Sequence, residues 1–251
     1  MRKYDIVNGL ARKRGYQSYL EICTPSTGMT FARVDRTQFP RCHRLLYRCP
    51  EGFTDGAEIT YRAANEDISG LIASNARYDC VFLDPFHSYE CSYRDLEIVL
   101  SLVSPHGVVV VHDCSPPTQD VCGPSPRQRR WCGCTYCAYI DFVFAHPELS
   151  YYTVDTDFGC GVIQKAPAAQ GTPVRKPDAV VDLSESWRAA RNRDADMYSF
   201  FDQHRRDLLN LVSVRQFLAA EHVPRPWPSE FKELRHRVLS RLRRVASLAG
   251  H

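Results

Sequence analysis

Two apolar segments of this chain each end in an aspartate with a histidine close by. Residues 81–95 read VFLDPFHSYECSYRD, with Asp84 and His87, and residues 108–114 read VVVVHDC, with His112 beside Asp113. An apolar run bounded by polar turn residues is typical of a buried parallel strand. Ligands bind at the carboxyl ends of the strands in open α/β sheets. The two segments together therefore predict a site for a hard cation and a base.

Structural roles for the same side chains stay open. An aspartate at the end of a strand often caps the following helix, which applies to Asp84 more than to Asp113. His87 can equally be a hydrogen-bonded loop histidine. His112 ends a strand, a position that is more often structural than catalytic.

The composition is that of an ordinary globular protein. The chain has 251 residues, of which 44% are hydrophobic and 24% charged, enough for one large α/β domain with a full core. The net charge of +3 is too small to imply a nucleic-acid partner. No segment approaches the roughly 20 apolar residues of a membrane helix, so no membrane partner is expected. The first residues lack the apolar stretch of a secretory signal, and we expect a cytoplasmic protein.

The pattern of apolar residues predicts the elements that must position these side chains. Strands are expected at 18–23, 43–49, 58–63, 79–84 and 108–112, helices at 3–15, 65–76, 89–103 and 135–147, and an SPHG turn before residue 108. Their alternation predicts a parallel sheet with right-handed crossovers. Residues 149–165 read as a hairpin that adds antiparallel edge strands. Helical stretches around 184–193 and 197–220 follow, and a basic amphipathic helix ends the chain after residue 228.

Eleven cysteines are a high count for such a protein. An odd number without a secretory signal argues against a disulfide framework. Cys132, Cys134 and Cys137 lie together in WCGCTYC, with Cys122 upstream. Thiolates at such spacing could hold zinc, although the spacing is not that of two paired CxxC motifs. Free thiols on a loop and at a helix start are the alternative.

The loop after the first expected strand has features of a ligand site. Glu21 lies near the end of that strand and Gly28 lies in the loop, where a glycine lets the backbone approach a ligand closely. The phosphate-binding patterns GxxxxGK[ST] and GxGxxG are absent. A ligand that carries an adenosine but no phosphates therefore fits better than a nucleoside triphosphate or a dinucleotide.

Several segments resemble one enzyme family. YLEICTPSTGMTF resembles the first motif of class I S-adenosylmethionine-dependent methyltransferases, and FLDPFHSYE, VVVHDC, WCG, VDTDFGCGVI and LLNLVSV resemble blocks of a bacterial group met in biosynthetic clusters. The resemblance covers roughly residues 17–218 and implies a Rossmann-like, doubly wound, mostly parallel seven-stranded sheet with a terminal antiparallel hairpin. We expect a methyltransferase domain at 1–167 and, at 168–251, a linker and a C-terminal helical extension packing on it.

The resemblance also implies roles for individual residues. Asp84 and Asp113 would be ligands of Mg²⁺, with Asp84 also bordering the cofactor, and His87 would be the catalytic base beside Asp113. The cofactor S-adenosylmethionine would be bound through its methionine part by Glu21, Cys23, Thr24, Gly28 and Thr30, at its ribose by Cys49 and at its adenine by Asn65.

These implications add up to one expected function and two alternatives. We expect metal-assisted O-methylation of a small hydroxylated molecule, such as a sugar or a natural-product intermediate, by an enzyme for which a homodimer is one expectation. Cys23 and Cys49 stand where the family usually has a glycine and an acidic residue, which motivates an enzyme of the same fold that binds the cofactor but no longer transfers methyl. The third hypothesis is a zinc-binding interaction module built on the segment CGCTYC.

Overall fold

The computed structural model describes residues 1–24, 30–47, 60–63, 70, 74–123, 130–165, 177–193 and 197–221. Most of the expected helix 65–76 and all of the basic helix after residue 228 lie outside the described residues. The same holds for three expected cofactor residues, Gly28, Cys49 and Asn65.

A single mixed sheet with strand order β3-β2-β1-β4-β5-β7-β6-β8 forms the centre of the fold. The strands are β1 (Ser18–Cys23), β2 (Arg41–Tyr47), β3 (Thr60–Ala63), β4 (Tyr78–Asp84), β5 (Val103–Val111), β6 (Ser150–Val154), β7 (Cys160–Gln164) and β8 (Leu211–Val212). The first five strands pair in parallel, and every described side chain of β1 is buried. The sheet has the Rossmann-like, mostly parallel arrangement that the sequence predicted.

The expected hairpin is present, but it is not the edge of the sheet. β7 runs antiparallel to β5, with Val109 opposite Ile163, and β6 runs antiparallel to β7. β8 then pairs with β6 in parallel, with Thr153 opposite Leu211. The expectation of hairpin edge strands was therefore wrong, because two residues from the C-terminal part cover the outer strand and satisfy its backbone groups.

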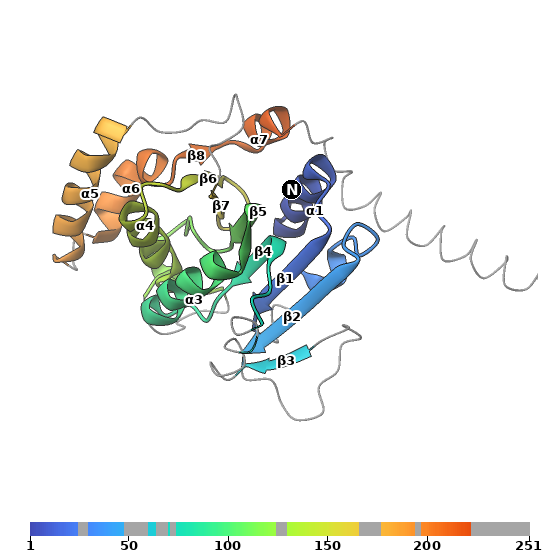
Figure 1. The fold of residues 1–251 in the computed structure, drawn as a ribbon. Coiled ribbons are helices and arrows are strands. Elements are labelled where there is room, and N and C mark those ends of the chain that lie inside the picture. Colours follow the sequence, from blue (N-terminus) through green and yellow to red (C-terminus); the bar gives the residue numbers. More distant parts are fainter. Residues whose placement is uncertain are drawn as a thin grey trace, which may run out of the picture.

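Helices cover both faces of the sheet (Figure 1). On one face lie α3 (Tyr89–Leu102) and α4 (Thr135–Ala145), with α5 (Pro177–Arg191) and α6 (Met197–Leu208) beyond α4. The other face carries α1 (Lys3–Arg14), and α7 (Val214–Ala220) follows β8. Two short 3-10 helices, η2 (Phe31–Arg33) and η3 (Gln119–Val121), complete the described elements.

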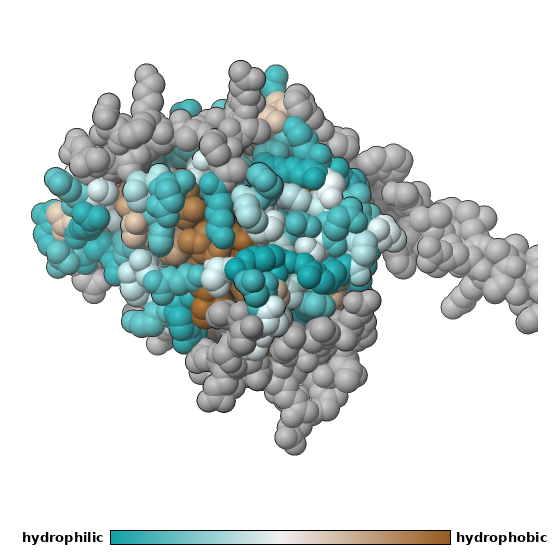
Figure 2. Space-filling model, in the orientation of Figure 1, coloured by the Kyte–Doolittle hydropathy of each residue, from teal (hydrophilic) through white to brown (hydrophobic). Residues whose placement is uncertain are grey.

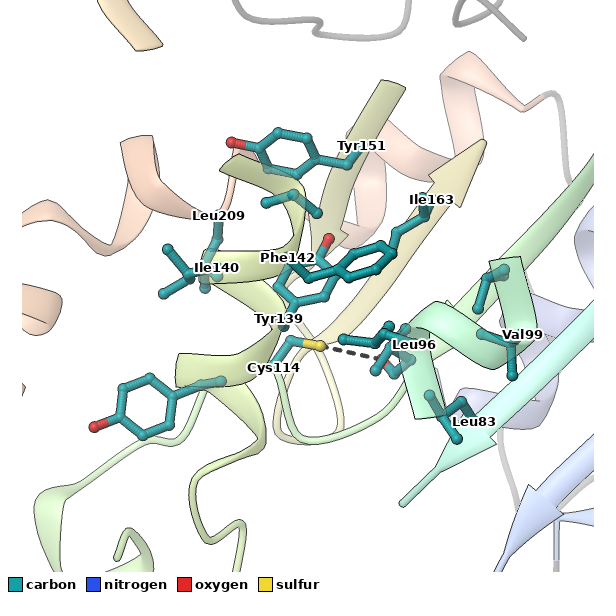
Figure 3. Close-up of a cluster of buried hydrophobic side chains, with 14 of the residues drawn as sticks. Leu83, Leu96, Val99, Cys114, Tyr139, Ile140, Phe142, Tyr151, Ile163 and Leu209 are labelled. Atoms are coloured by element: carbon teal, nitrogen blue, oxygen red, sulfur yellow. Dashed lines mark hydrogen bonds between the residues drawn. The ribbon is translucent and has the colours of Figure 1, made fainter. Parts of the chain in front are cut away.

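Two apolar clusters hold these layers together. The first lies between the sheet and helices α3, α4 and α6, and Figure 3 shows Leu83, Leu96, Val99 and Phe142 of this cluster facing one another. The second joins Ile6, Val7 and Leu10 of α1 to the opposite face of the sheet. Alternate residues of β4 and β5 therefore point to different clusters, which fixes the direction of every side chain at their carboxyl ends.

Two sequence-based boundaries were wrong for tertiary reasons. The SPHG segment is not a separate turn, because β5 begins at Val103 and continues through it with an irregularity opposite Tyr78 and Cys80. The stretch 197–220 is not one helix, because α6 ends at Leu208 and β8 interrupts the chain before α7. The division of the chain at residue 167 stays a prediction.

The surface in the orientation of Figure 1 is mostly hydrophilic, with an apolar region near its middle (Figure 2). None of the described helices combines the length and the apolar composition needed to cross a bilayer.

Candidate active site at the carboxyl edge of the sheet

The carboxyl ends of β4 and β5 bring together the four side chains that the sequence singled out. Asp84 is the last residue of β4, and His112 and Asp113 directly follow β5. His87 lies in the loop between β4 and α3. Because β4 and β5 are parallel neighbours, their ends meet at one edge of the sheet, as the sequence predicted.

The two histidines lie between the two carboxylates. Nε2 of His87 is 3.0 Å from Oδ2 of Asp113 and 3.4 Å from Oδ1 of Asp84. Nδ1 of His112 is 3.1 Å from the same oxygen of Asp113 and 3.4 Å from the same oxygen of Asp84. Asp84 is fully buried and Asp113 is nearly so. Two buried carboxylates thus face inward on a shared space rather than outward into solvent.

A fifth side chain, Lys3, reaches the same cluster from α1. Its ammonium lies 2.7 Å from Oδ2 of Asp84 and 3.5 Å from Nδ1 of His112. The start of the helix is tied to the hairpin loop, because the backbone N–H of Lys3 donates to Asp157 and the guanidinium of Arg2 also contacts that carboxylate. The first turn of α1 is therefore part of the site.

The turn after β5 is held in an unusual conformation. Asp113 has φ 60°, in the left-handed region that a non-glycine residue rarely adopts. The next two backbone N–H groups, of Cys114 and Ser115, donate to the carbonyls of Gly159 and Phe158 in the hairpin loop. These bonds offset the local strain and fix the direction of the Asp113 carboxylate.

The WCG segment holds His87 in place. The backbone N–H of Cys134 donates to the carbonyl of His87 at 2.8 Å. The indole of Trp131 packs edge-on to the imidazole, with ring centroids 5.1 Å apart. Gly133 has φ 60°, and a Cβ there would overlap the backbone of His87. The WCG segment therefore orients the histidine.

The opposite charges of the aspartates and the histidines, more than their burial, set the pKa values of these four side chains. Burial by itself would lower the pKa of His87 and of His112, but the two carboxylates raise these pKa values to about 9 and about 10. Burial opposes ionisation of Asp113, yet the charge of His112 and hydrogen bonds from both histidines lower its pKa to about 2. The pKa of Asp84 is also held well below its usual range, against burial, by His112 and Lys3. At neutral pH both histidines therefore carry their protons.

The donor set matches a divalent cation. Asp84 and Asp113 each offer a carboxylate oxygen, and His87 offers a ring nitrogen once it has lost its proton; these three atoms lie within 4.8 Å of one another. They are the one group of three or more such ligands among the described residues. Cys132, Cys134 and Cys137 form no such group, and Cys137 instead contacts the sulfur of Met197. Burial also raises the pKa of Cys132 and Cys137, which opposes thiolate formation.

The cofactor side of the expected site lies at the end of β1. Cys23 is paired with Asp84 across the sheet, which places this strand end next to the acidic cluster. The carboxylate of Glu21 is fully buried and accepts hydrogen bonds from Tyr19 and Cys23. Burial raises the pKa of Glu21 to about 7. Thr24 is half-buried beyond the strand, and Thr30 is buried with no partner for its hydroxyl among the described residues.

A pocket of about 470 Å³ opens beside the turn after β5. Ser115 and the hairpin-loop residues Asp157 and Phe158 line it, together with the side chains of Arg2 and Arg205. The guanidinium of Arg205 is fixed by hydrogen bonds to Ser115, Tyr198 and Asp202. The pocket and the acidic cluster are neighbours, since Asp157 anchors Lys3 and Ser115 is two residues from Asp113.

Sequence reasoning missed Lys3 and Arg205 and undervalued His112. Lys3 lies on a helix with no motif around it, and Arg205 lies just before the block LLNLVSV, which gave no sign of a site residue, so only the packing of their helices reveals their place. His112 did carry a signal, because it shares the strand-end position with Asp113. Its Nε2 is buried with no partner among the described residues.

Comparison with known proteins points to one family. Residues 10–114 match a family model described as a methyltransferase domain. No curated protein matches the sequence. Solved structures with a similar fold include the S-adenosylhomocysteine-bound methyltransferase PaMTH1 of Podospora anserina, at 14% identity over 65% of this chain and 77% of that one, with a TM-score of 0.47.

Two further structures are those of O-methyltransferases. The enzyme from Bacillus cereus, in complex with S-adenosylhomocysteine, is 15% identical over 64% of this chain and 80% of that one, with a TM-score of 0.47. TomG from Streptomyces achromogenes, involved in tomaymycin synthesis and in complex with S-adenosylmethionine, is 15% identical over 64% and 78%, with a TM-score of 0.44. Identities this low carry no information about the acceptor. Residues 10–114, which hold strands β1 to β5 as well as Asp84, His87 and Asp113, are thus similar to a methyltransferase domain.

Proposed function

We propose that the protein methylates an oxygen of a small hydroxylated molecule, such as a sugar or a natural-product intermediate, with the help of a divalent cation. The observation that carries this proposal is the group Asp84, His87 and Asp113, whose ligand atoms lie within 4.8 Å at the carboxyl edge of the sheet. A neutral hydroxyl is a poor nucleophile toward a sulfonium. The site must therefore lower the pKa of that hydroxyl or remove its proton.

Asp84 and Asp113 would hold the cation, which we expect to be Mg²⁺, and His87 is the third donor within reach. Carboxylate oxygens suit Mg²⁺, while a mixed set of oxygens and an imidazole also suits Mn²⁺. When bound, the cation would lower the pKa of a hydroxyl on the acceptor. The residues contribute a buried, correctly directed pair of negative charges, because their strand ends are fixed by the sheet.

His87 is the base that the sequence predicted, and its surroundings set a condition on that role. Beside two ionised carboxylates it keeps its proton at neutral pH, since its pKa is raised to about 9. It would accept a proton near neutrality only when their charge is balanced. Its position between the carboxylates and the WCG segment gives it a fixed direction in either case.

S-adenosylmethionine would lie at the ends of β1 and β2. We propose contacts from Glu21, Cys23, Thr24 and Thr30, and from Gly28, Cys49 and Asn65 outside the described residues. The buried hydroxyl of Thr30, which has no partner among the described residues, supports a ligand there because buried polar groups normally form hydrogen bonds. The pocket beside Ser115 would receive the acceptor.

Two measurements test the proposal. Isothermal titration of the full chain with S-adenosylhomocysteine should show one binding site per chain. Methyl transfer from labelled S-adenosylmethionine should then be screened over hydroxylated acceptors with Mg²⁺ and with EDTA. Failure to bind either form of the cofactor would refute the function as a whole, whereas transfer that persists in EDTA would refute only the metal role.

Three expectations about the protein in the cell and in solution stay predictions. We infer a cytoplasmic location and no nucleic-acid or membrane partner, and a homodimer is one expectation for an oligomeric state that the sequence leaves open.

A further inference from the structure

The ammonium of Lys3 occupies one oxygen of a proposed metal ligand. It lies 2.7 Å from Oδ2 of Asp84, which is the distance of a direct ion pair with a hydrogen bond. The other oxygen of Asp84 is the one near His87 and His112. Lys3 therefore leaves this carboxylate only one oxygen for a metal ion, and that oxygen is already close to two imidazoles.

Contacts of the backbone and of the ammonium both hold Lys3 in position. Its backbone N–H donates to Oδ2 of Asp157 at 3.0 Å, and its ammonium also passes 5.7 Å from the ring centroid of Phe82. Only 16% of its side chain is exposed. A lysine on a surface helix usually extends into water, so this buried and anchored position is a specific feature of the site.

An ammonium and a divalent cation repel each other strongly at this range. Like charges about 4 Å apart in a protein of low effective dielectric interact far more than they do in water. Both would also need the same carboxylate as their counter-charge. The two cations would therefore weaken each other's binding if both contacted Asp84.

We propose that Lys3 is a resident counter-cation of the Asp84–Asp113 pair, beside the two histidines, and competes with a divalent ion for it. This inference rests on the proposed function, since it concerns the same carboxylates. A divalent ion binds both carboxylates tightly only after Lys3 leaves Asp84, and the anchor at Asp157 sets how readily Lys3 leaves. Lys3 is thus a positioning residue that determines how much metal is needed to fill the site.

Binding of Mn²⁺ to the full chain tests this competition without any assay of methyl transfer. Mn²⁺ is the probe because its free form is counted directly by electron paramagnetic resonance. In Lys3→Met the affinity for Mn²⁺ should rise about tenfold or more, since removal of a charge a few ångströms away changes binding by several times the thermal energy. Lys3→Arg keeps the charge and should bind Mn²⁺ no better than the wild type.

Lys13→Met is the matched control, because Lys13 is an exposed lysine on the same helix. Its affinity for Mn²⁺ should equal that of the wild type. Asp157→Ala is a second variant that leaves both carboxylates of the cluster intact and releases the backbone of Lys3. It should raise the affinity by a smaller factor than Lys3→Met. It also keeps the test decisive if Lys3→Met does not fold.

The outcomes separate this inference from the proposed function. Equal Mn²⁺ affinities in the wild type, Lys3→Met and Asp157→Ala would overturn the competition while leaving the metal site standing. Absence of Mn²⁺ binding in all of them would overturn the competition and the metal role together. Titration with S-adenosylhomocysteine, run on the same samples, reports whether the cofactor part of the function stands independently.

Discussion

Nε2 of His87 lies 3.0 Å from Oδ2 of Asp113, although the two residues follow different strands. The contact exists because β4 and β5 are parallel neighbours, with Leu83 opposite Val111, so that their following loops start side by side. The loop of His87 is then held by the WCG segment, and the turn of Asp113 is held by the hairpin loop. Four separate segments of the chain thus determine one contact.

Asp113→Asn should abolish most methyl transfer while the protein stays folded. The change removes the charge that the cation and His87 both require, and we expect a loss of about 100-fold or more in kcat/KM. Glu148→Gln is the control, because Glu148 is an exposed carboxylate that likewise pairs with a histidine, His146. Unchanged activity in Asp113→Asn would show that the carboxylate is only structural.

Because the histidines are charged, the free energy of unfolding of the protein should fall as the pH becomes alkaline. The pKa of His112 is raised to about 10 in the folded protein, against about 6.5 when unfolded. The contribution of protonated His112 to the free energy of unfolding is therefore complete below about pH 6.5 and is lost as the pH rises through about 10. The difference in free energy of unfolding between the wild type and His112→Gln should narrow by roughly 4 kcal/mol between pH 6 and pH 10.

Urea denaturation at the two pH values, in buffers free of divalent ions, measures this gap. Asp84 and Asp113 stay ionised over the whole range, because their pKa values are lowered, and do not contribute to the change. A gap that is constant, or that widens toward pH 10, would mean that His112 is neutral in the folded protein.

The elements that carry the site were predictable because their apolar patterns are local. The strand 18–23 was predicted with its observed bounds, and the helix predicted at 89–103 ends one residue earlier. Because strand ends in a parallel sheet meet at one edge, the proximity of Asp84, His87 and Asp113 followed from these elements alone. No detail of side-chain packing was needed for that step.

The errors concern partners that are distant in the sequence. Leu211 and Val212 form a strand only because β6 offers them an unpaired edge, and a helical pattern around them cannot show this. Lys3 reaches Asp84 only because α1 packs against that face of the sheet. Neither spacing nor composition in the first turn of a helix reveals such a contact, since a lysine there normally faces water.

Gly133→Ala should disturb His87 and lower stability. Gly133 has a positive φ, and the new Cβ would overlap the backbone of His87. We expect a loss of roughly 2–4 kcal/mol, the sum of the backbone strain and the displaced neighbour. Gly123→Ala is the matched control, because Gly123 also has a positive φ but no atom of the described residues lies within 4 Å of its Cβ position.

Thermal denaturation ranks the two variants, and Gly133→Ala should unfold at the lower temperature. The same variant should lose methyl transfer at temperatures where it is still folded, because His87 no longer faces Asp113. Equal melting temperatures for the two variants would show that the WCG segment does not constrain the histidine.

Glu21→Gln should change the pH dependence of stability and the pH dependence of cofactor affinity in different ways. Burial raises the pKa of Glu21 to about 7, so its carboxyl is mostly neutral at pH 5.5 and ionised at an energetic cost at pH 8.5. A glutamine is neutral at both. Because the pKa of Glu21 is raised in the folded protein, the free energy of unfolding of the wild type falls as the pH rises from about 4.5 through about 7. The free energy of unfolding of Glu21→Gln, taken relative to that of the wild type, should therefore be higher at pH 8.5 than at pH 5.5.

The affinity of the wild type for S-adenosylhomocysteine should change with pH in the opposite direction to its stability. If Glu21 orients the end of β1 for the cofactor through its ionised form, the affinity of the wild type for S-adenosylhomocysteine should rise between pH 5.5 and pH 8.5, while that of Glu21→Gln should stay flat. Calorimetric titration at the two pH values measures both slopes. Parallel slopes in the two proteins would remove Glu21 from the cofactor site and leave it as a buried partner of Tyr19 and Cys23.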